Sequence, residues 1–217
     1  MTRYPLAIFD FDGTLVRSDD CITRSLEAAL SGRSLPCDVA VARGLIGLPL
    51  DRIVRRLGGE HLDDDAVGAV VSAYRGHYAA FEPELVACYP EVPEVLHALH
   101  AAGVTLAIAT SKTTRGVSAT MERLGVAPLF THVVGNDRVA RGKPDPEMVH
   151  TILSLAGRAA AEAIVVGDTT FDVEMATAAG VASCAVTYGN HPASRLAEAR
   201  PTFVVDAPAR IVAVFGI

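Results

Sequence analysis

Short apolar segments recur along the chain, and they predict buried β-strands. Each is apolar almost throughout rather than alternating with polar residues, which is typical of strands in a parallel sheet covered on both faces. The first of them ends at a polar turn that contains glycine, as a strand followed by a loop should. The predicted strands comprise residues 6–9, 104–109, 163–166, 181–186 and 202–205.

Segments with apolar residues at helical spacing lie between most of these strands. A glycine directly follows each segment, and glycine at this position is a common end of a helix. Strands and helices that alternate with short links predict an α/β fold with a doubly wound parallel sheet. The predicted helices comprise residues 93–102, 115–124, 146–156 and 171–179.

Residues 16–88 break this alternation, because they show no strong strand and several helical patterns instead. We therefore expect an all-helical domain, residues 16–88, inserted after the first strand. Residues 1–15 and 89–217 would then form the α/β core. The helical patterns of the insertion comprise residues 21–30, 38–43, 50–57 and 66–81.

Composition narrows the class of protein. The chain has 217 residues, half of them hydrophobic, which is enough for a large buried core. Its formal net charge of −6 argues against general nucleic-acid binding, which usually needs a basic face. Its four cysteines form no Cys-x-x-Cys pair, so we expect reduced thiols rather than zinc or disulfides. With no signal peptide and no apolar run near the ~20 residues of a membrane span, we expect a cytoplasmic protein without a membrane partner.

Polar residues follow three of the predicted strands, and one lysine precedes a predicted helix. In an open parallel sheet, ligands bind at the carboxyl ends of the strands, so these residues are expected to meet there. Each has an ordinary structural role as well: Asp-Gly is a common turn, Thr-Ser a helix cap, and a lysine usually lies in solvent. The evidence is therefore their combination. The candidate residues are Asp10, Asp12, Thr110, Ser111, Lys143, Asp168 and Asp172.

These residue types suit phosphoryl transfer. The Asp10 carboxylate can attack phosphorus, and a second carboxyl group, Asp12, can protonate the leaving oxygen and then activate water. Two carboxylates so close together need a cation, and Mg²⁺ prefers carboxylate oxygens, water and a phosphate oxygen. Asp168 would complete the acidic site, and Asp172 could brace it.

Two further side chains would stabilise the phosphoryl group itself. Thr110 can donate a hydrogen bond to a phosphoryl oxygen, and Lys143 can neutralise charge on the nucleophile and the phosphate. Lys143 is notable because the chain, although rich in arginine, contains only one other lysine, Lys112.

The order of these motifs resembles the haloacid dehalogenase superfamily along the whole chain. Residues 10–15, Asp-Phe-Asp-Gly-Thr-Leu, look like its first motif, Thr110 its second, Lys143 its third, and residues 167–172, Gly-Asp-Thr-Thr-Phe-Asp, its fourth. The resemblance implies a Rossmann-like core with a helical cap at residues 16–88, closing over the active site.

The resemblance also implies roles for the site residues. Asp10 would be the nucleophile and Asp12 the general acid and base. Mg²⁺ would be held by Asp10, Asp168 and the backbone carbonyl of Asp12, and phosphate by Thr110 and the Ser111 backbone.

Branches of this superfamily differ in ways that the sequence can address. Asp12 favours a phosphate ester over a haloacid, because relatives that cleave carbon–halogen bonds lack an acid there. Residues 16–88 contain no lysine, unlike the cap of phosphonate-cleaving relatives. The nearest resemblance, at residues 45–50, 89–93 and 141–147, is to phosphoglycolate phosphatase-like members, and pyrophosphatase and nucleotidase relatives share it. A sugar-phosphate mutase like β-phosphoglucomutase remains an alternative, although residues 17–21 lack the histidine that such relatives often carry.

We therefore expect a Mg²⁺-dependent phosphatase that hydrolyses a small phosphorylated metabolite through an aspartyl-phosphate, as a monomer or homodimer. Arg43 and Gly47 are candidates for contact with the substrate, although Arg43 could equally be a solvated residue beside an interhelical turn. Two other classes compete with this interpretation. One is a catalytically silent binding protein with the same fold, and the other is a receiver-like domain phosphorylated on Asp10. The presence of Asp10, Asp12, Lys143 and Asp168 disfavours the first, and Asp12 with the cap disfavours the second.

Overall fold

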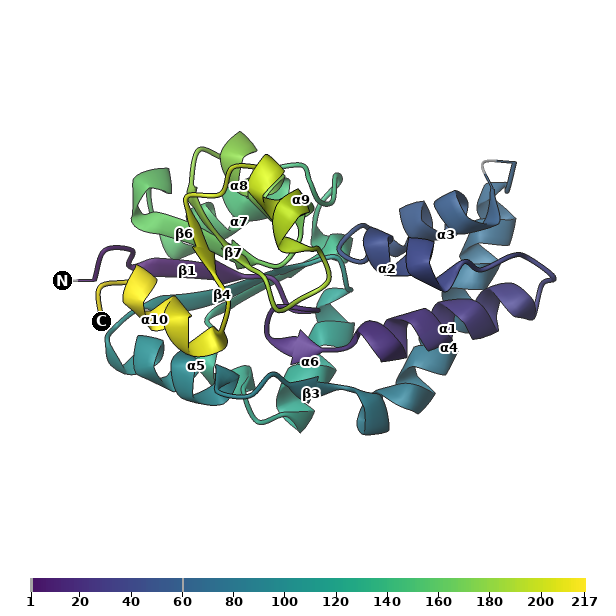
Figure 1. The fold of residues 1–217 in the computed structure, drawn as a ribbon, viewed down its shortest axis with the longest axis horizontal. Helices are drawn as coiled ribbons and strands as arrows, with labels where there is room; N and C mark the ends of the chain where they lie inside the picture. The colour runs from purple at the N-terminus through teal and green to yellow at the C-terminus, as the bar shows by residue number, and fades with distance from the viewer. Residues whose placement is uncertain (1, 60) are drawn as a thin grey trace.

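The structure is a computed structural model that describes residues 2–59 and 61–217. Figure 1 shows an elongated molecule in which a sheet flanked by helices lies at one end and a group of helices at the other. We call residues 16–88, which contain that second group, the helical insert. Its two connections to the rest of the chain lie next to each other.

A parallel sheet of six strands forms the core, in the order β5-β4-β1-β6-β7-β8. The central strand β1 pairs with β4 on one side and with β6 on the other, where Leu6 is opposite Thr105 and Ala163. The strands are β1 (Leu6–Phe9), β4 (Thr105–Thr110), β5 (His132–Gly135), β6 (Ala163–Gly167), β7 (Ala182–Val186) and β8 (Phe203–Val205). All five predicted strands are confirmed, and β5 was not predicted.

Helices cover both faces of the sheet, as a doubly wound fold requires. Alternate residues of β1 face opposite sides: Phe9 packs in a cluster with Leu99, whereas Ile8 packs in another with Ile152. This confirms the predicted α/β class. The helices of the core are α5 (Val92–Ala101), α6 (Thr114–Arg123), α7 (Glu147–Ala156), α8 (Thr170–Ala178), α9 (Ala193–Glu198) and α10 (Ile211–Val214). Short 3-10 turns lie at Ala127–Leu129, Asn136–Arg138, Ala160–Glu162 and Pro208–Arg210.

The helical insert is built around α1 (Asp19–Ser31), α2 (Val39–Leu45), α3 (Leu50–Gly58) and α4 (Asp64–Leu85). The long helices α1 and α4 lie side by side (Figure 1). Leu26, Leu45 and Ile53 pack together in one apolar cluster. Asp38 and Asp63 begin their helices as N-caps, because their side chains accept hydrogen bonds from backbone N–H groups of the first turn.

One expectation for this region was wrong, because the insert does contain strand structure. β2 (Val16–Arg17) pairs antiparallel with β3 (Ala87–Cys88), so that Val16 is opposite Cys88. With two residues each, these strands are too short to produce an apolar pattern in the sequence. They join the outgoing and returning chain into one ribbon. None of the helices in residues 2–59 and 61–217 is both long and apolar enough to cross a membrane.

Candidate active site

A pocket of about 680 Å³ lies where the carboxyl ends of β1 and β4 face the helical insert. From the core it is lined by Asp10, Asp12 and Thr110. From the insert it is lined largely by apolar and aromatic side chains, among them Leu48, Ile53 and Tyr74. The site therefore lies where ligands bind in open α/β sheets, and its insert side is largely apolar but also carries Asp51, Arg75 and Glu82.

Lys143 joins two of the predicted carboxylates at the base of this site. Its fully buried ammonium donates to Oδ1 of Asp10 and to Oδ1 of Asp172, each at 2.6 Å. Burial alone would lower the pKa of Lys143, but the charges of Asp10 and Asp172 outweigh it and raise the pKa above its usual range. Lys143 is thus held as a cation against the proposed nucleophile.

Asp168 is held by residues from two other segments. One of its carboxylate oxygens accepts from Thr14 Oγ1 at 3.0 Å. The other accepts from the backbone N–H and the side-chain amide of Asn190, at 2.7 and 2.8 Å. Gly13, whose φ is +91°, lies so close that a Cβ there would be 2.2 Å from Asp168 Oδ2. The first motif therefore needs glycine because the Asp168 carboxylate occupies the space of a side chain.

The geometry of the acidic group fits a divalent cation. Asp10, Asp168 and Asp172 are buried, and each offers an oxygen within 4.8 Å of the others. Burial, together with neighbouring carboxylates, raises the pKa of Asp10 well above its usual range and that of Asp168 to about 6. Lys143 balances only part of this charge. Hard cations such as Mg²⁺ prefer carboxylate oxygens, so the donor set suits one.

Asp172 already has chain partners for both of its oxygens. In addition to Lys143 at Oδ1, its Oδ2 accepts from the backbone N–H and the hydroxyl of Thr169, at 3.0 and 2.7 Å. These contacts suit the predicted bracing role, in which Asp172 orients Lys143 beside Asp10.

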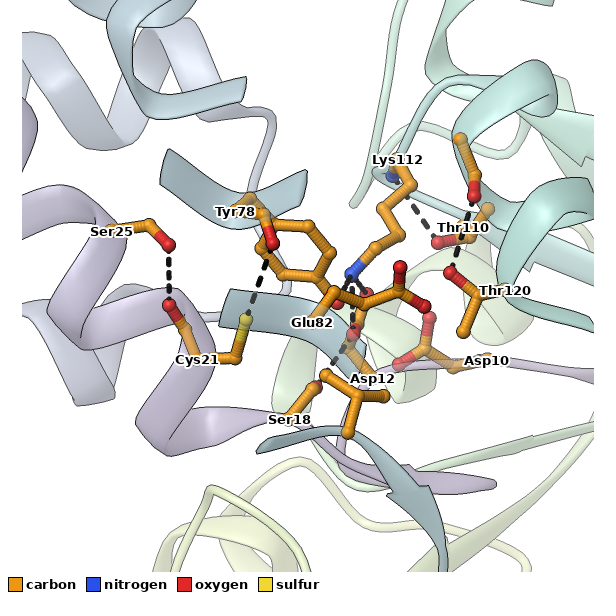
Figure 2. A network of polar contacts seen from close by, with 12 residues as sticks. Asp10, Asp12, Ser18, Cys21, Ser25, Tyr78, Glu82, Thr110, Lys112 and Thr120 are labelled. Atoms are coloured by element: carbon orange, nitrogen blue, oxygen red, sulfur yellow. Dashed lines mark hydrogen bonds and ion pairs between the residues drawn. The ribbon is translucent and has the colours of Figure 1, made fainter. Parts of the chain in front are cut away.

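Asp12 points its side chain toward the insert rather than toward Asp168. Its carboxylate accepts from Ser18 Oγ at 2.6 Å and from the ammonium of Lys112 at 2.6 and 2.7 Å (Figure 2). Lys112 also contacts the hydroxyl of Tyr78, in α4, at 2.8 Å. The backbone carbonyl of Asp12, the atom predicted to bind metal, accepts from the Asn190 side chain at 3.5 Å.

Thr110 and Ser111, both predicted to bind phosphate, make different contacts. Thr110 is buried in the pocket wall, and its hydroxyl oxygen accepts from the backbone N–H of Lys112 at 3.2 Å, so that its proton remains free to donate. Ser111 Oγ instead donates to the backbone carbonyl of Gly47 at 2.6 Å. Ser111 therefore links the core to the insert.

The two candidate substrate contacts of the insert differ. Gly47 lines the pocket, in a loop with a φ of +104°. The structure does not bring Arg43 there: its half-exposed guanidinium pairs with Asp19 and with Asp20 of α1. The sequence placed Arg43 near the right loop, but the direction of its side chain depends on the packing of α2 against α1.

Several residues of the site were not predicted: Ser18, Tyr78, Lys112 and Asn190. The sequence could have indicated Lys112 as a site residue, because it directly follows Thr110 and Ser111 and is one of only two lysines. The sequence could not have indicated Asn190, because it lies in a turn after β7 and only the folding of the chain brings it to Asp168.

Comparison with known proteins agrees with this geometry. The profile of the haloacid dehalogenase-like hydrolases matches residues 7–186. The chain is 39% identical to "Probable phosphatase IndB" of Dickeya dadantii, covering 96% of this chain and 92% of that protein. It is 32% identical to a phosphoglycolate phosphatase of Pseudomonas savastanoi, covering 93% of this chain and 76% of that protein. A haloacid dehalogenase-like hydrolase from Streptococcus pneumoniae superposes with a TM-score of 0.85 at 26% identity, covering 98% of this chain and 99% of that one.

Proposed function

Because this chain belongs to the haloacid dehalogenase-like hydrolases and is a phosphatase of that family, we propose that it hydrolyses a small phosphate monoester through a phosphoryl group carried on Asp10. The observation that carries this proposal is the contact of buried Lys143 with both Asp172 and Asp10, of which Asp10 lines the pocket and lies beside Asp168. Such a constellation suits charge stabilisation during phosphoryl transfer.

The proposed reaction has two half-reactions. An oxygen of Asp10 attacks phosphorus, the bond from phosphorus to the ester oxygen breaks, and Asp12 donates a proton to the departing alcohol. Asp12 then takes a proton from water as the water oxygen attacks the aspartyl-phosphate. The bond between Asp10 and phosphorus breaks, and inorganic phosphate leaves. Thr110 donates its free hydroxyl proton to a phosphoryl oxygen throughout.

We propose Mg²⁺ as the cation, held by Asp10, Asp168 and the carbonyl of Asp12. When bound, it offsets the negative charge that nucleophile and phosphate bring together. Lys143 holds Asp10 in place for attack, and Asn190 with Thr14 fixes Asp168.

We also propose that residues 16–88 act as a cap on the core of residues 1–15 and 89–217. The apolar wall supplied by Ile53 and Tyr74 would then exclude water and select the leaving group. Relatives named phosphoglycolate phosphatase support a small organic phosphate as the substrate.

The test is turnover of 4-nitrophenyl phosphate with Mg²⁺, followed by a panel of phosphoglycolate, sugar phosphates, nucleotides and pyrophosphate. Asp10→Asn should lower kcat by about 10⁴-fold or more, because it removes the nucleophile. Intact-mass measurement of rapidly quenched wild-type enzyme should find a phosphoryl adduct that is missing in Asp10→Asn. Full activity of Asp10→Asn would sink the proposal, and isomerisation primed by a bisphosphate would replace it with a mutase.

A further inference from the structure

Lys112 makes several polar contacts at the pocket, which its place in the sequence did not indicate. Its ammonium lies 2.6 and 2.7 Å from the two carboxylate oxygens of Asp12 and 2.8 Å from the Tyr78 hydroxyl (Figure 2). The same nitrogen lies 4.2 Å from the centroid of the Tyr78 ring, a cation–π contact. Three oxygens and a ring face thus surround one ammonium group.

These contacts unite three parts of the chain. Asp12 lies in the loop after β1, Lys112 lies after β4, and Tyr78 belongs to α4 of the helical insert. The side chains of Lys112 and Asp12 are only 16% and 12% exposed, so water screens their attraction little. Ser18 Oγ, at the start of the insert, donates to the same carboxylate at 2.6 Å.

The arrangement fixes the direction of the Asp12 carboxylate. Without partners, that side chain can rotate about two bonds; with Ser18 at one oxygen and Lys112 across both, one orientation is favoured. An ion-paired carboxylate is also the form that can accept a proton from water. Lys143 already occupies the position of the cation beside Asp10, so Lys112 is free for this separate task.

We propose that Lys112 is a positioning residue for Asp12, and that Tyr78 makes this positioning depend on contact between the helical insert and the core. The inference rests on the proposed phosphatase reaction, in which Asp12 takes the proton of the attacking water. Lys112 forms and breaks no bond to substrate; it acts through the direction of the Asp12 carboxylate. When the insert moves away, Lys112 loses the hydroxyl and the ring of Tyr78.

The experiment separates the two half-reactions with 4-nitrophenyl phosphate, whose phenolate leaves without needing a proton. In Lys112→Met, kcat should fall about 100-fold, because water attack on the aspartyl-phosphate becomes slow. Such a fall is at the lower end of what loss of a general base typically causes. The value of kcat/KM, which reports formation of that intermediate, should change less than about fivefold, so KM falls in parallel. A burst of one equivalent of nitrophenolate should precede slow turnover.

Companion variants test whether the effect passes through Asp12. Lys112→Arg should restore most of kcat, since it keeps the cation. Tyr78→Phe should show the same pattern as Lys112→Met at about a tenth of its size, and it serves as the test if Lys112→Met fails to fold. In an Asp12→Asn background, Lys112→Met should cost little more, as expected for residues that act as a unit. Arg24→Met removes an exposed cation of α1 and should leave both constants unchanged.

Two results would overturn the inference. One is an equal loss of kcat and kcat/KM with no burst, which would assign Lys112 to the transition state of phosphoryl transfer to Asp10. The other is full additivity of Lys112→Met with Asp12→Asn. Either result, with Asp10→Asn inactive, leaves the phosphatase proposal standing; activity of Asp10→Asn would overturn both.

Discussion

The α/β core buries one cluster of charged side chains, whereas the ion pairs within the helical insert lie at the surface. In the core, Lys143, Asp168 and Asp172 are 0%, 0% and 1% exposed. In the insert, ion pairs lie at the surface, as between Arg55 and Asp64, whose side chain is 98% exposed. Buried charges persist only where partners offset their desolvation, whereas surface pairs contribute about 0–1 kcal/mol each.

This difference separates two tasks. In the proposed reaction the buried core charges act on the phosphoryl group, and the insert supplies the largely apolar wall of the pocket. Substitutions of core charges should therefore change activity and stability together, whereas most insert charges should change neither. The exceptions are residues at contacts between the two parts, among them Ser111 with Gly47, Lys112 with Tyr78, Arg123 with Glu82, and His191 with Gly44.

The largest effect is expected when Lys143 is removed. Lys143→Met leaves Asp10 and Asp172 buried without their cation, which should lower the free energy of unfolding by about 3–5 kcal/mol and abolish turnover. Urea unfolding followed by circular dichroism measures the loss. The matched variant in the insert, Arg55→Met, should cost less than about 1 kcal/mol. Similar losses of unfolding free energy in the two variants would contradict the proposed difference between the core and the insert.

Metal binding should also stabilise the core selectively. Mg²⁺ at 100 times its dissociation constant should add about 2.7 kcal/mol to the free energy of unfolding, because the proposed acidic site exists only in the folded protein. Thermal unfolding with Mg²⁺ or with EDTA measures this. Asp168→Asn should remove the Mg²⁺ effect, and Arg55→Met should keep it. An undiminished effect in Asp168→Asn would place the metal elsewhere.

A third effect should appear with pH at the contact between the parts. His191 is buried; its Nδ1 accepts from the Thr170 backbone N–H at 3.0 Å and its Nε2 lies 3.3 Å from the Gly44 carbonyl. Burial, with the nearby charge of Arg195, lowers the pKa of His191 to about 4 from its usual 6.5. As the pH falls below 6.5, the unfolded chain therefore binds this proton first, and folded stability is lost down to about pH 4.

This loss amounts to about 2 kcal/mol between pH 6.5 and pH 5. The raised pKa values of Asp10 and Asp168 act in the opposite sense, since those groups bind protons more readily when folded. The difference between wild type and His191→Gln in metal-free buffer isolates the histidine. Parallel stability curves for the two proteins would show that folding does not shift the pKa of His191.

The smallest effect is expected for Arg43, the candidate that the structure pairs with Asp19 and Asp20. Arg43→Met should change KM for the best substrate of the panel less than about twofold and stability by less than about 1 kcal/mol. Steady-state kinetics, with Arg24→Met as the control, measures the difference. A tenfold rise in KM would return Arg43 to the substrate pocket.

The fold was largely predictable because its strands are buried on both faces. Continuous apolar segments such as Leu6–Phe9 indicate such strands without any need for alternation. β5 was missed because His132 and Gly135 leave only two consecutive apolar residues in this strand, too few for a recognisable pattern. α4 was predicted to end at residue 81 but continues to Leu85, past Pro83.

The sequence predicted those site residues that lie next to a predicted strand or helix. Asp10, Lys143 and Asp168 each lie at the end of a predicted element, and the topology alone brings those ends together. The contact between Lys112 and Tyr78 spans 34 residues of chain, and it depends on how α4 lies over the core. The direction of the Arg43 side chain depends on packing in the same way, which residue type does not reveal.

The ribbon of β2 and β3 has a mechanical consequence. Both covalent links to the insert cross at one place, where Val16 pairs with Cys88, only six residues beyond Asp10. In a rotation of the insert about this ribbon, the displacement of each atom grows with its distance from the ribbon. The far loop near residues 32–37 would therefore sweep a wide arc, while Ser18 would shift only slightly beside the Asp12 carboxylate (Figure 1). A large displacement at the far end of the insert can thus coexist with a nearly fixed Ser18 at its base.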